Sequence, residues 1–266
     1  LKGSVLQFCV VCGEVYGQLA ALAGICDFNF FIEDKSVLCE NSPLVIAAKS
    51  GINASAKEIG GADGLKKTNL VTFKVSGIAD VREKILAITS AISPAAVDCN
   101  EMNVTVDELN VSASAENIQK LFDSDGIVEV GAPYSPDVKC VLGRMGGIAC
   151  AAVIFDGEDG VKLNARKVKK IKDFAELACC RDLPLVFFVN CIGLCPSIEN
   201  HSSLVLKEVA ELINVLDCCD KKISVISGKA VGLGYTLFAA KSMGYDYTFA
   251  FANAKVALFD DVQGAE

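Results

Sequence analysis

The sequence predicts an α/β protein in which helices cover the faces of largely buried strands. The chain has 266 residues, of which 52% are hydrophobic, and this is enough to form a substantial core. Apolar runs rich in Val, Ile and Phe alternate with amphipathic stretches, as expected of buried strands between helices. A strand that ends at a glycine and leads into a small-residue helix occurs twice, after Gly13 and after Gly228.

The strands and the clearest helix follow from periodicity. Between the strands, one segment repeats apolar residues such as Val168, Ile171 and Phe174 at helical spacing and is expected to be a helix over residues 164–181. A polar, turn-rich segment at residues 100–124 predicts an exposed connection, and we expect two domains, residues 1–117 and 118–266. The runs expected to be strands are residues 6–12, 28–32, 138–142, 148–155, 185–190, 222–226 and 247–250.

Composition excludes several classes of function. The net charge is −8 without a dense Lys/Arg cluster, so a nucleic-acid partner is not expected. The longest apolar runs, such as residues 183–194, are shorter than the roughly 18 residues that span a bilayer. No secretory signal is expected, and thirteen cysteines scattered through strand-like runs favour a reducing cytoplasm. Cys9 and Cys12 alone lack the four ligands of a structural zinc site, so no metal is predicted.

An internal repeat links the two glycine turns. Gly13 and Gly17 in the first copy match Gly228 and Gly232 in the second at the same spacing. An Asp that opens an aromatic strand follows the short helix each time, and a Lys with Leu three residues on comes after that strand. This order of features indicates a duplication. The matched pairs are Asp27 with Asp246, Lys35 with Lys255 and Leu38 with Leu258.

Such turns have a chemical use. Backbone N–H groups at the start of a helix lack intrahelical acceptors, so they can stabilise an oxyanion. Glycine lets a carbonyl group approach closely and takes positive φ without strain. The alternative is that these glycines serve only to pack each helix tightly against its strand.

The other candidate reactive groups disfavour several classes of enzyme. His201 is the only histidine, and with no Gly-x-Ser-x-Gly turn in the chain a serine hydrolase is disfavoured. Neither glycine turn continues into the Gly-Lys-Ser/Thr of a nucleoside triphosphate site. Glu14, between Gly13 and Gly17, is a candidate general base or simply a charge at the start of a helix.

Several segments resemble a known family. The landmarks at residues 58–62, 76–79 and 92–94 follow the family's order, so the resemblance covers nearly the whole chain. The strongest matches, at residues 143–147, 182–196 and 228–235, resemble the acyl-CoA carboxyltransferase subunits of biotin-dependent carboxylases and decarboxylases, which are crotonase-like proteins.

The resemblance implies a fold and an assembly. It implies two crotonase-like (ClpP/crotonase) ββα spiral domains related by internal duplication, the first one incomplete because the family's earlier N-domain strands precede residue 1. In the family the active site forms between the N-domain of one subunit and the C-domain of another, so a homo-oligomer is expected. Biotin is expected on a carrier protein, and the expected partners are a biotin carboxyl carrier protein with biotin carboxylase or a membrane decarboxylase subunit.

The resemblance also implies the chemistry and its residues. The family moves a carboxyl group between N1 of biotin and the α-carbon of an acyl-CoA, with backbone amides that hold the enolate oxygen and the biotin ureido oxygen. By position, the amides of Gly17 and Gln18 would face the acyl thioester. The residues expected on the biotin side are Leu233 and Gly234 as donors, with Gly193, Leu194 and Gly232 beside them.

The sequence departs from the family at both turns. Gly-Gly is commoner where Gly17-Gln18 and Gly232-Leu233 stand, although a backbone donor tolerates a side chain that points away. Two alternatives to the carboxyltransferase remain: an enoyl-CoA hydratase or isomerase that uses Glu14, and a non-catalytic subunit that keeps the fold. The sequence predicts neither the acyl group nor the direction of carboxyl transfer.

Overall fold

The structure is a computed structural model that describes residues 3–94, 114–123, 126–202 and 205–259, without the side chains of residues 201 and 202. The chain divides into two compact units, each described here by itself. Unit 1 comprises residues 1–86 and 130–134, and unit 2 comprises residues 87–129 and 135–266. The domain boundary near Ile118 stays a prediction.

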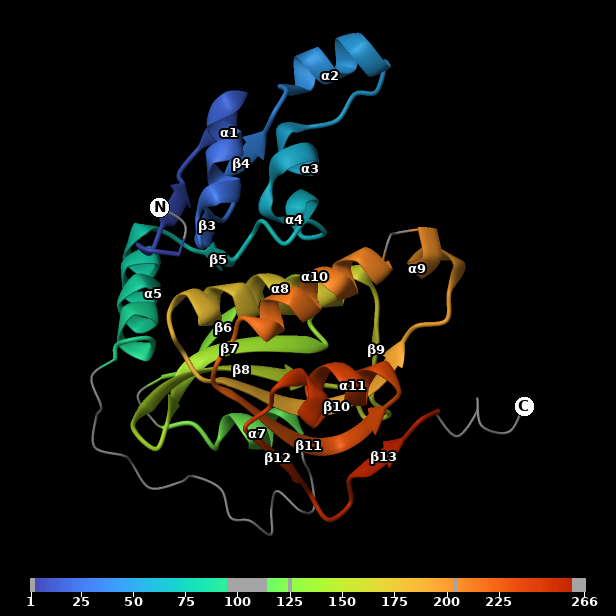
Figure 1. The fold of residues 1–266 in the computed structure, drawn as a ribbon. Helices are drawn as coiled ribbons and strands as arrows, with labels where there is room; N and C mark the ends of the chain where they lie inside the picture. The colour runs from blue at the N-terminus through green and yellow to red at the C-terminus, as the bar shows by residue number, and fades with distance from the viewer. Residues whose placement is uncertain (1–2, 95–113, 124–125, 203–204, 260–266) are drawn as a thin grey trace. The chain divides into compact units, whose positions relative to one another are not determined.

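Unit 1 is built around two small parallel sheets (Figure 1). In one, β3 lies between β1 and β5, and its residues Phe28, Phe30 and Phe31 are completely buried. The other sheet pairs β2 with β4. The strands are β1 (Phe8–Val11), β2 (Glu14–Tyr16), β3 (Phe28–Ile32), β4 (Val37–Cys39) and β5 (Phe73–Val75). The helices are α1 (Gln18–Leu22), η1 (Ala23–Ile25), α2 (Pro43–Ser50), α3 (Ala56–Gly60) and α4 (Ala62–Leu65), and α5 (Ile78–Ala91) passes from unit 1 into unit 2.

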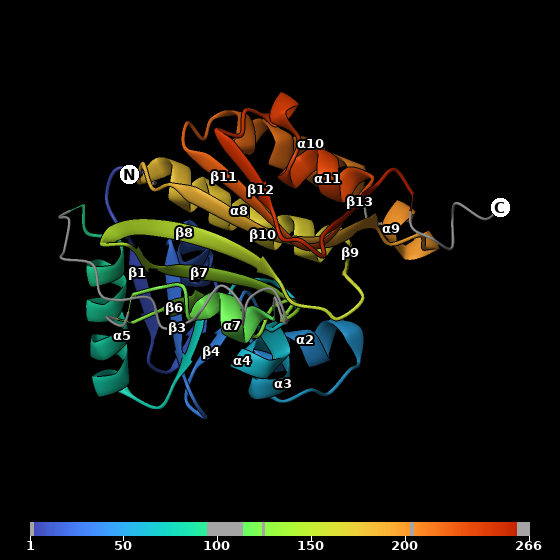
Figure 2. The same ribbon diagram turned by 90° about the horizontal axis from the view of Figure 1, so that it is seen from below.

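Unit 2 contains an eight-stranded sheet with helices on both faces (Figure 1, Figure 2). Its main path runs β12, β11, β10, β8, β7, β6, while β9 pairs with β10 and β13 with β11. The strands are β6 (Val128–Val130), β7 (Val138–Met145), β8 (Ile148–Phe155), β9 (Val161–Leu163), β10 (Leu185–Leu194), β11 (Lys222–Val231), β12 (Tyr247–Ala250) and β13 (Lys255–Ala257). The helices are α7 (Ala115–Gln119), α8 (Ala165–Cys180), α9 (Ile198–Ser202), α10 (Val205–Asp217), α11 (Leu233–Phe238) and η2 (Lys241–Met243).

Helices cover both faces of this sheet because their apolar stripes face it. α8 and α10 lie on one face and α7 on the other (Figure 1, Figure 2). Val168 and Ile171 on α8 are fully buried, as the helical spacing predicts. Ile118 on α7 packs into a cluster with Phe188 of β10. The predicted α/β fold, its seven strands and the helix at residues 164–181 are confirmed.

One predicted connection is partly wrong. Most of residues 100–124, which we expected to be exposed, lies outside the described residues. The described end forms α7, where Ser114 caps the helix by accepting from the Asn117 amide, and Ile118 and Phe122 are buried. The many polar residues of this short stretch obscure, in the sequence, the apolar face that contacts the sheet.

The duplication is confirmed by strand register. In unit 1, Phe8 pairs with Phe28 across β1 and β3, and in unit 2, Ile223 pairs with Tyr247 across β11 and β12. Both pairings are parallel, and they join equivalent positions of the repeat. The duplicated ββα unit therefore exists in the backbone as well as in the sequence.

A carboxylate fixes the same corner in each copy. The Gln7 amide donates to Asp27 Oδ2 at 2.8 Å, and the Lys222 amide donates to Asp246 Oδ2 at 3.0 Å. Each Asp amide donates back to the carbonyl of its partner. The recurring Asp therefore has a structural reason: it accepts the amide at the start of β11 in unit 2 and the amide just before β1 in unit 1.

The matched Lys and Leu residues of the repeat are a wrong prediction. Val37 pairs with Glu14 in unit 1, and Lys255 pairs with Lys229 in unit 2. Lys255 is thus the equivalent of Val37, and Lys35 lies two positions away from that pairing. Backbone pairing sets the register of a strand, so the shared residue types are a coincidence.

The strands before the turns also run further than expected. β11 continues past Gly228 to Val231, and β10 continues to Leu194. The register shifts between Val189 and Cys191, so β11 carries extra residues at a bulge. In unit 1 the chain breaks at the equivalent place into β1 and β2.

Two simpler findings concern environment. The described residues contain no helix long and apolar enough to cross a bilayer. The cysteines among them are free thiols, and burial raises the pKa of Cys140 and of Cys191 to about 12, which keeps these two in the unreactive thiol form.

Candidate functional site

The first turn joins β2 to α1 through Gly17. Its backbone has φ 72° and ψ −144°, a combination that glycine alone adopts readily. The Gly17 amide donates to the carbonyls of Cys39 at 3.1 Å and Glu40 at 2.9 Å. These bonds fix the turn against the end of β4, and α1 begins at the next residue.

The second turn, between β11 and α11, has the same construction. Gly232 has φ 51° and ψ −120°, and its amide donates to the Ala257 carbonyl at 3.0 Å. Ala257 occupies on β13 the place that Cys39 occupies on β4, because Tyr16 pairs with Cys39 and Val231 with Ala257. Gly17 and Gly232 are therefore structural equivalents.

In each turn the first two amides of the helix have no acceptor among the described residues. In unit 1 these are the amides of Gln18 and Leu19, and in unit 2 those of Leu233 and Gly234. A pair of adjacent N–H donors on a rigid turn can bind a carbonyl oxygen that gains negative charge.

The geometry changes the choice of donors in unit 1. The Gly17 amide, which we expected to face the thioester, is already hydrogen bonded within the chain. Leu19, which the sequence reasoning missed, is the equivalent of Gly234. The constant spacing of the repeat was the signal, since it aligns Gln18 with Leu233 and Leu19 with Gly234.

On the side of unit 2, β10 lies against the start of α11. A Cβ on Gly234 would come 2.6 Å from the Cys191 carbonyl oxygen, so only glycine fits there. A Cβ on Gly193, which has φ 82°, would come 3.7 Å from the Leu233 nitrogen. Leu194 follows on β10, where it pairs with Leu163 of β9.

The predicted site residues thus fall into two groups. The structure brings Gly193 of β10 beside the turn at Gly232, Leu233 and Gly234 in unit 2, and Leu194 follows Gly193 on that strand. Gly17 and Gln18 belong to unit 1.

Asn190 supports the second group, and the sequence reasoning missed it. Its Nδ2 donates to the Gly157 carbonyl, and its Oδ1 accepts the Lys229 amide at 2.9 Å. Gly228 passes so close that a Cβ there would come 2.5 Å from Asn190 Oδ1. Asn190 therefore holds the bulge in β11 that carries the chain on to Gly232. An amide side chain inside an otherwise apolar strand was the available signal.

Several family landmarks prove to be structural. Gly60 lies against β4, where a Cβ would come 2.5 Å from the Leu38 carbonyl oxygen. The buried Arg144 donates to the carbonyls of Ser90, Ser93 and Gly147. These contacts explain the residues without assigning them chemistry.

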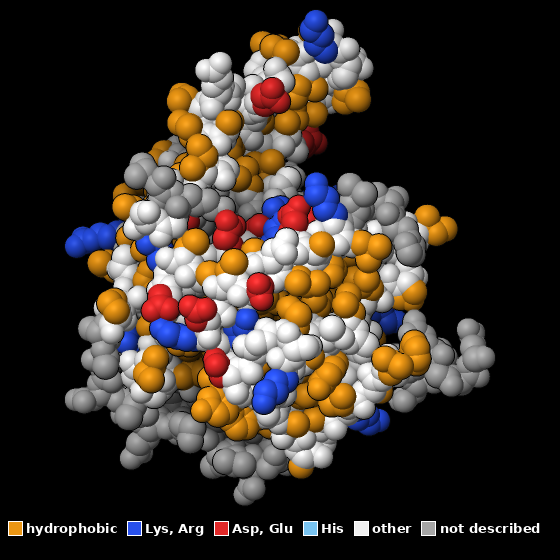
Figure 3. Space-filling model, viewed as in Figure 1, with side chains coloured by type: hydrophobic (Ala, Val, Ile, Leu, Met, Phe, Trp, Pro, Cys, Tyr) orange, Lys and Arg blue, Asp and Glu red, His pale blue; other side chains and the backbone are white. Residues whose placement is uncertain are grey.

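The surroundings of the first turn are apolar and exposed. Leu19 and Leu22 on α1 have 66% and 54% of their surface exposed, and hydrophobic side chains are visible over this helix in Figure 3. Glu14, the candidate base, accepts a hydrogen bond from the Tyr16 hydroxyl at 2.8 Å. This bond raises the pKa of Tyr16 above its ordinary value. His201 lies on α9, and its side chain is outside the described part of the chain.

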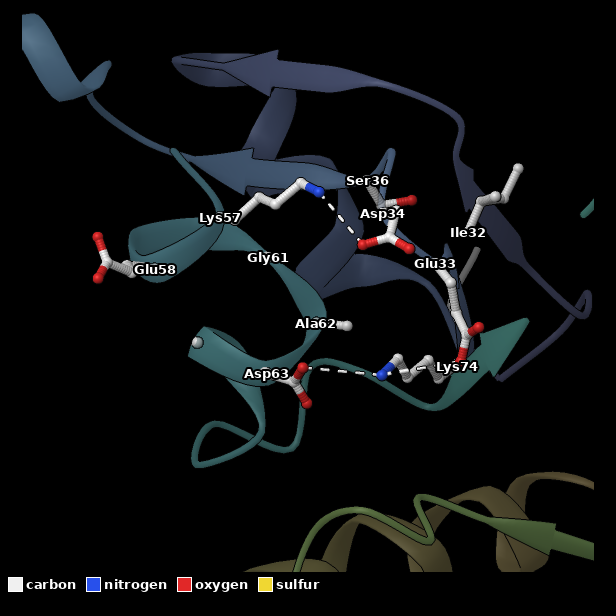
Figure 4. A pocket seen from close by; sticks show the side chains of 11 residues that line it. Ile32, Glu33, Asp34, Ser36, Lys57, Glu58, Gly61, Ala62, Asp63 and Lys74 are labelled. Atoms are coloured by element: carbon white, nitrogen blue, oxygen red, sulfur yellow. Dashed lines mark hydrogen bonds and ion pairs between the residues drawn. The ribbon is translucent and has the colours of Figure 1, made fainter. Parts of the chain in front are cut away.

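Unit 1 also contains a polar pocket of about 480 Å³ (Figure 4). Lys57 pairs there with Asp34 at 3.2 Å, and Lys74 lies 3.7 Å from both Glu33 and Asp63. With four carboxylates against two lysines, the lining disfavours the phosphates of a coenzyme. None of the predicted site residues lines this pocket.

Comparison with known proteins places these turns in context. The chain matches the family described as the carboxyl transferase domain over residues 1–265. The beta5 subunit of the biotin-dependent acetyl-/propionyl-coenzyme A carboxylase of Mycobacterium leprae is 23% identical over 97% of this chain and 52% of its own length. The methylmalonyl-CoA decarboxylase subunit alpha of Propionigenium modestum is 22% identical over 97% of this chain and 53% of its own length. The chain spans about half the length of the curated relatives it matches.

A solved structure shares the fold. Transcarboxylase 12S, solved as a hexamer with hydrolysed methylmalonyl-coenzyme A bound, superposes with a TM-score of 0.90 at 20% identity, over 100% of this chain and 56% of its own. The crotonase-like fold of a carboxyltransferase, expected from the resemblance, is confirmed.

Proposed function

The chain belongs to the carboxyl transferase domain family, and we propose that it is part of a biotin-dependent carboxyltransferase that acts on an acyl-CoA. The observation that carries this proposal is the repeated turn. Gly17 and Gly232 have a similar positive-φ backbone, each donates its amide to a neighbouring strand, and each precedes two amides without an acceptor among the described residues. Two carbonyl groups that gain negative charge need two such donor pairs.

The first turn would bind the acyl-CoA. We assign its two donors to Gln18 and Leu19, which would hold the thioester oxygen while the α-carbon carries an enolate. Gly17 would contribute through its backbone conformation, because its positive φ directs the Gln18 and Leu19 amides away from β2. The exposed side chains of Leu19 and Leu22 give this turn an apolar border that suits an acyl chain.

The second turn fits the flat ureido ring of biotin. Gly193 presents a Cα hydrogen where any other residue would place a Cβ near the Leu233 nitrogen, so the space before this amide stays open. The Leu233 and Gly234 amides would donate to the ureido oxygen, with Gly193, Leu194 and Gly232 as the border. When it is bound, biotin supplies N1 as the atom that carries the carboxyl group. Leu233 offers its backbone N–H, so its side chain need not take part.

The reaction balances without a catalytic histidine or metal from this chain. In the carboxylation direction the bond between the carboxyl carbon and N1 breaks, a bond from that carbon to the acyl α-carbon forms, and the α-proton passes to N1. The residues of the chain hold the two oxygens and the orientation. In the decarboxylation direction the same bonds are exchanged in reverse.

Partners and location follow as parts of the same proposal. Biotin would arrive on a biotin carboxyl carrier protein, loaded by a biotin carboxylase or served by a membrane decarboxylase subunit. We propose a homo-oligomer in the cytoplasm. The hexamer described for transcarboxylase 12S supports an assembly, and the free thiols among the described residues agree with a reducing compartment.

The test uses the full chain with a biotinylated carrier protein and either malonyl-CoA or methylmalonyl-CoA. We expect transfer of the carboxyl group to the carrier. Gly17→Ala would strain the positive φ of the turn and misdirect the Gln18 and Leu19 amides, so we expect kcat to fall by about 10²- to 10³-fold, as it does when an oxyanion donor is lost. Gly51→Ala is the matched control in unit 1. It also has a positive φ, 71°, and it caps α2 away from the turn, so activity should stay within about twofold.

Two results would contradict the proposal. One is an assembled wild-type chain that transfers no carboxyl group from either substrate. The other is a Gly17→Ala variant that folds and keeps the wild-type kcat. If the Gly17→Ala and Gly51→Ala variants lose activity equally relative to wild type, the loss reflects stability alone.

A further inference from the structure

Two half-buried thiols lie on either side of the first turn along the chain. Cys9 belongs to β1, and Cys26 follows η1 directly, before the Asp27 that is hydrogen bonded to the start of β1. The Cys9 thiol donates a hydrogen bond to the sulfur of Cys26, so the two side chains are in contact. The chain between them contains β2, Gly17 and α1. A bond between the two sulfurs would therefore close a loop that contains the complete turn.

The surroundings of the two thiols couple them to the turn. Cys9 pairs with Asn29 of β3 and packs against the apolar cluster that includes Ala23. Cys26 Sγ donates to the Leu22 carbonyl oxygen at 3.6 Å, and the Cys26 amide donates to the Ala23 carbonyl at 3.3 Å. Leu22 ends α1 and Ala23 begins η1, so the two helices are continuous. A movement of Cys26 would therefore pass directly to η1 and α1.

The second copy of the repeat has the same corner without thiols. Ser224 takes the place of Cys9 on β11, because it pairs with β12 as Cys9 pairs with β3. Tyr245 takes the place of Cys26 before the recurring Asp. Serine and tyrosine form no disulfide, so the corner does not depend on thiols for its fold. The second turn is thus an internal control for the first.

We propose that Cys9 and Cys26 are an oxidative modification site, at which hydrogen peroxide joins the two thiols in a disulfide and so inactivates the first turn. The Cys26 thiolate attacks one peroxide oxygen, the O–O bond breaks, water leaves, and Cys26 becomes a sulfenic acid. The Cys9 thiolate then attacks that sulfur, so that the S–S bond forms, the S–O bond breaks and a second water leaves. The two thiol protons end in the two waters, and a thiol reductant reverses the modification.

The environment of the thiols sets the conditions for this reaction. Burial raises the pKa of both Cys9 and Cys26 above the ordinary value, and the charge of Asp27 raises that of Cys26 further. The thiolate is the reactive form, so both residues react slowly at neutral pH. The two thiols therefore stay reduced at low peroxide and are oxidised when peroxide is abundant.

The disulfide should displace the two donors of the first turn. A covalent bond holds two sulfurs closer together than a hydrogen bond does, so the end of η1 must move toward β1. α1 begins with Gln18 and Leu19, whose amides hold the thioester oxygen in the proposed function. A misplacement of about 1 Å can cost about 10²-fold in rate. This effect on turnover rests on the proposed function, whereas the disulfide and the displacement do not.

The first test detects the disulfide by mass spectrometry. The full chain is reduced, treated with hydrogen peroxide, alkylated, and cleaved with trypsin and a protease that cuts after Glu14, which puts Cys9 and Cys26 on separate peptides. We expect these peptides to be joined in wild type. They should also be joined in Cys12→Ser, the control at an exposed thiol three residues from Cys9. A disulfide between Cys9 and Cys12 would overturn the proposal, as would Cys9 and Cys26 that stay free at a peroxide concentration that oxidises Cys12.

The second test follows the turn itself. In the oxidised protein the amide NMR signals of Gln18 and Leu19 should shift, while those of Leu233 and Gly234 in the second turn should not. The kcat for carboxyl transfer should fall at least about tenfold and should return when dithiothreitol reduces the disulfide.

Cys26→Ser separates the disulfide from general oxidation. Serine keeps a donor for the Leu22 carbonyl, so the turn should keep its shape. The variant retains the other described cysteines, and its kcat should stay within about twofold after peroxide. Equal losses in wild type and Cys26→Ser would overturn the proposal, and so would a disulfide that leaves the Gln18 and Leu19 signals in place. A reduced wild type without carboxyl transfer would contradict the proposed function alone, and the two amide signals would then decide this proposal.

Discussion

Gly193 lies against the amide of Leu233, so that a Cβ on Gly193 would come 3.7 Å from the Leu233 nitrogen and 3.4 Å from the Val231 carbonyl oxygen. The two residues are forty positions apart and meet because β10 and β11 run side by side. Because residue 193 has no side chain, the space in front of the Leu233 amide stays open to a ligand.

Gly193→Ala should therefore impair the biotin side of the reaction. The methyl group narrows the approach to the Leu233 amide, and the φ of 82° becomes strained for a residue with a Cβ. We expect kcat/KM for free biotin or the carrier to fall at least about tenfold, which corresponds to roughly 1.4 kcal/mol. Acyl-CoA binding, measured by calorimetry, should not change.

Gly146→Ala is the control for backbone strain. Gly146 also has a positive φ, 59°, and among the described residues a Cβ there would meet nothing within 4 Å. It lies in the β7–β8 hairpin, so biotin kinetics should be unaffected. Equal losses in both variants, or weaker acyl-CoA binding by Gly193→Ala alone, would contradict the assignment of this turn to biotin.

Gly234→Ala should destabilise the protein through a direct clash. Its Cβ would stand 2.6 Å from the Cys191 carbonyl oxygen and 2.9 Å from Cys191 Sγ, so α11 must move away from β10. Overpacking of this kind costs about 1–3 kcal/mol in the free energy of unfolding. Urea unfolding measures the change, and Gly13→Ala, whose Cβ meets no described atom within 4 Å, should stay within about 0.5 kcal/mol of wild type.

The outcome for Gly234→Ala also distinguishes packing from chemistry. If stability stays at the wild-type value, α11 is more mobile than its close contact implies, and the glycine is required for another reason. Cys191→Ala should not rescue the variant, because the nearer atom is the backbone oxygen.

Strands, the longest amphipathic helix and the repeat could be predicted because they depend on local patterns. The apolar runs of β3 and β8 and the stripe on α8 report burial directly. The hydrogen bond from the Gly17 amide to the Cys39 carbonyl could not be predicted, because the pairing of β2 with β4 sets where that carbonyl lies. A short sequence match likewise could not reveal that Lys255 lies opposite Lys229.

The extent of β11 was missed for a similar reason. Glycine usually weakens a strand, so Gly228 suggested an end. The strand continues because Asn190 on β10 accepts the Lys229 amide and leaves no room for a side chain at Gly228. The donors of the site are backbone groups, and their direction depends on such contacts more than on residue type.

The ion pairs between α8 and α10 should make stability depend on pH. Burial lowers the pKa of Lys172, but its hydrogen bonds and charge interactions with Glu208 and Glu211 raise it above the ordinary value overall. The hydrogen bond to Lys172 lowers the pKa of Glu211. The Glu211 contribution is therefore complete above pH 4.5 and is lost as the pH falls through the lowered folded pKa. The Lys172 contribution is complete below pH 10.5 and is lost as the pH rises through the raised folded pKa.

Lys172→Met should remove both effects. The urea midpoint of the variant should lie below that of wild type at neutral pH, and the gap should close below pH 4.5 and above pH 10.5. Lys169→Met breaks the more exposed pair with Asp173 and should change the midpoint less. A gap that persists at a pH low enough to protonate both carboxylates would show that Lys172 acts through packing of its aliphatic stem.

Glu14→Gln decides between the proposed carboxyltransferase and a hydratase or isomerase of the same fold. Glu14 accepts a hydrogen bond from the Tyr16 hydroxyl, and glutamine keeps an acceptor there, so the turn at Gly17 should keep its shape. The rate of carboxyl transfer from methylmalonyl-CoA should stay within about twofold of wild type, because Glu14 is not a base in that reaction. Removal of an essential general base would lower the rate about 10²- to 10⁴-fold. The rate of hydration of an enoyl-CoA is measured on the same preparations. If wild type hydrates an enoyl-CoA, and this activity vanishes in Glu14→Gln and returns in part in Glu14→Asp, the chain is a hydratase. The Glu14 carboxylate would then transfer the proton that, in a carboxyltransferase, passes to N1 of biotin.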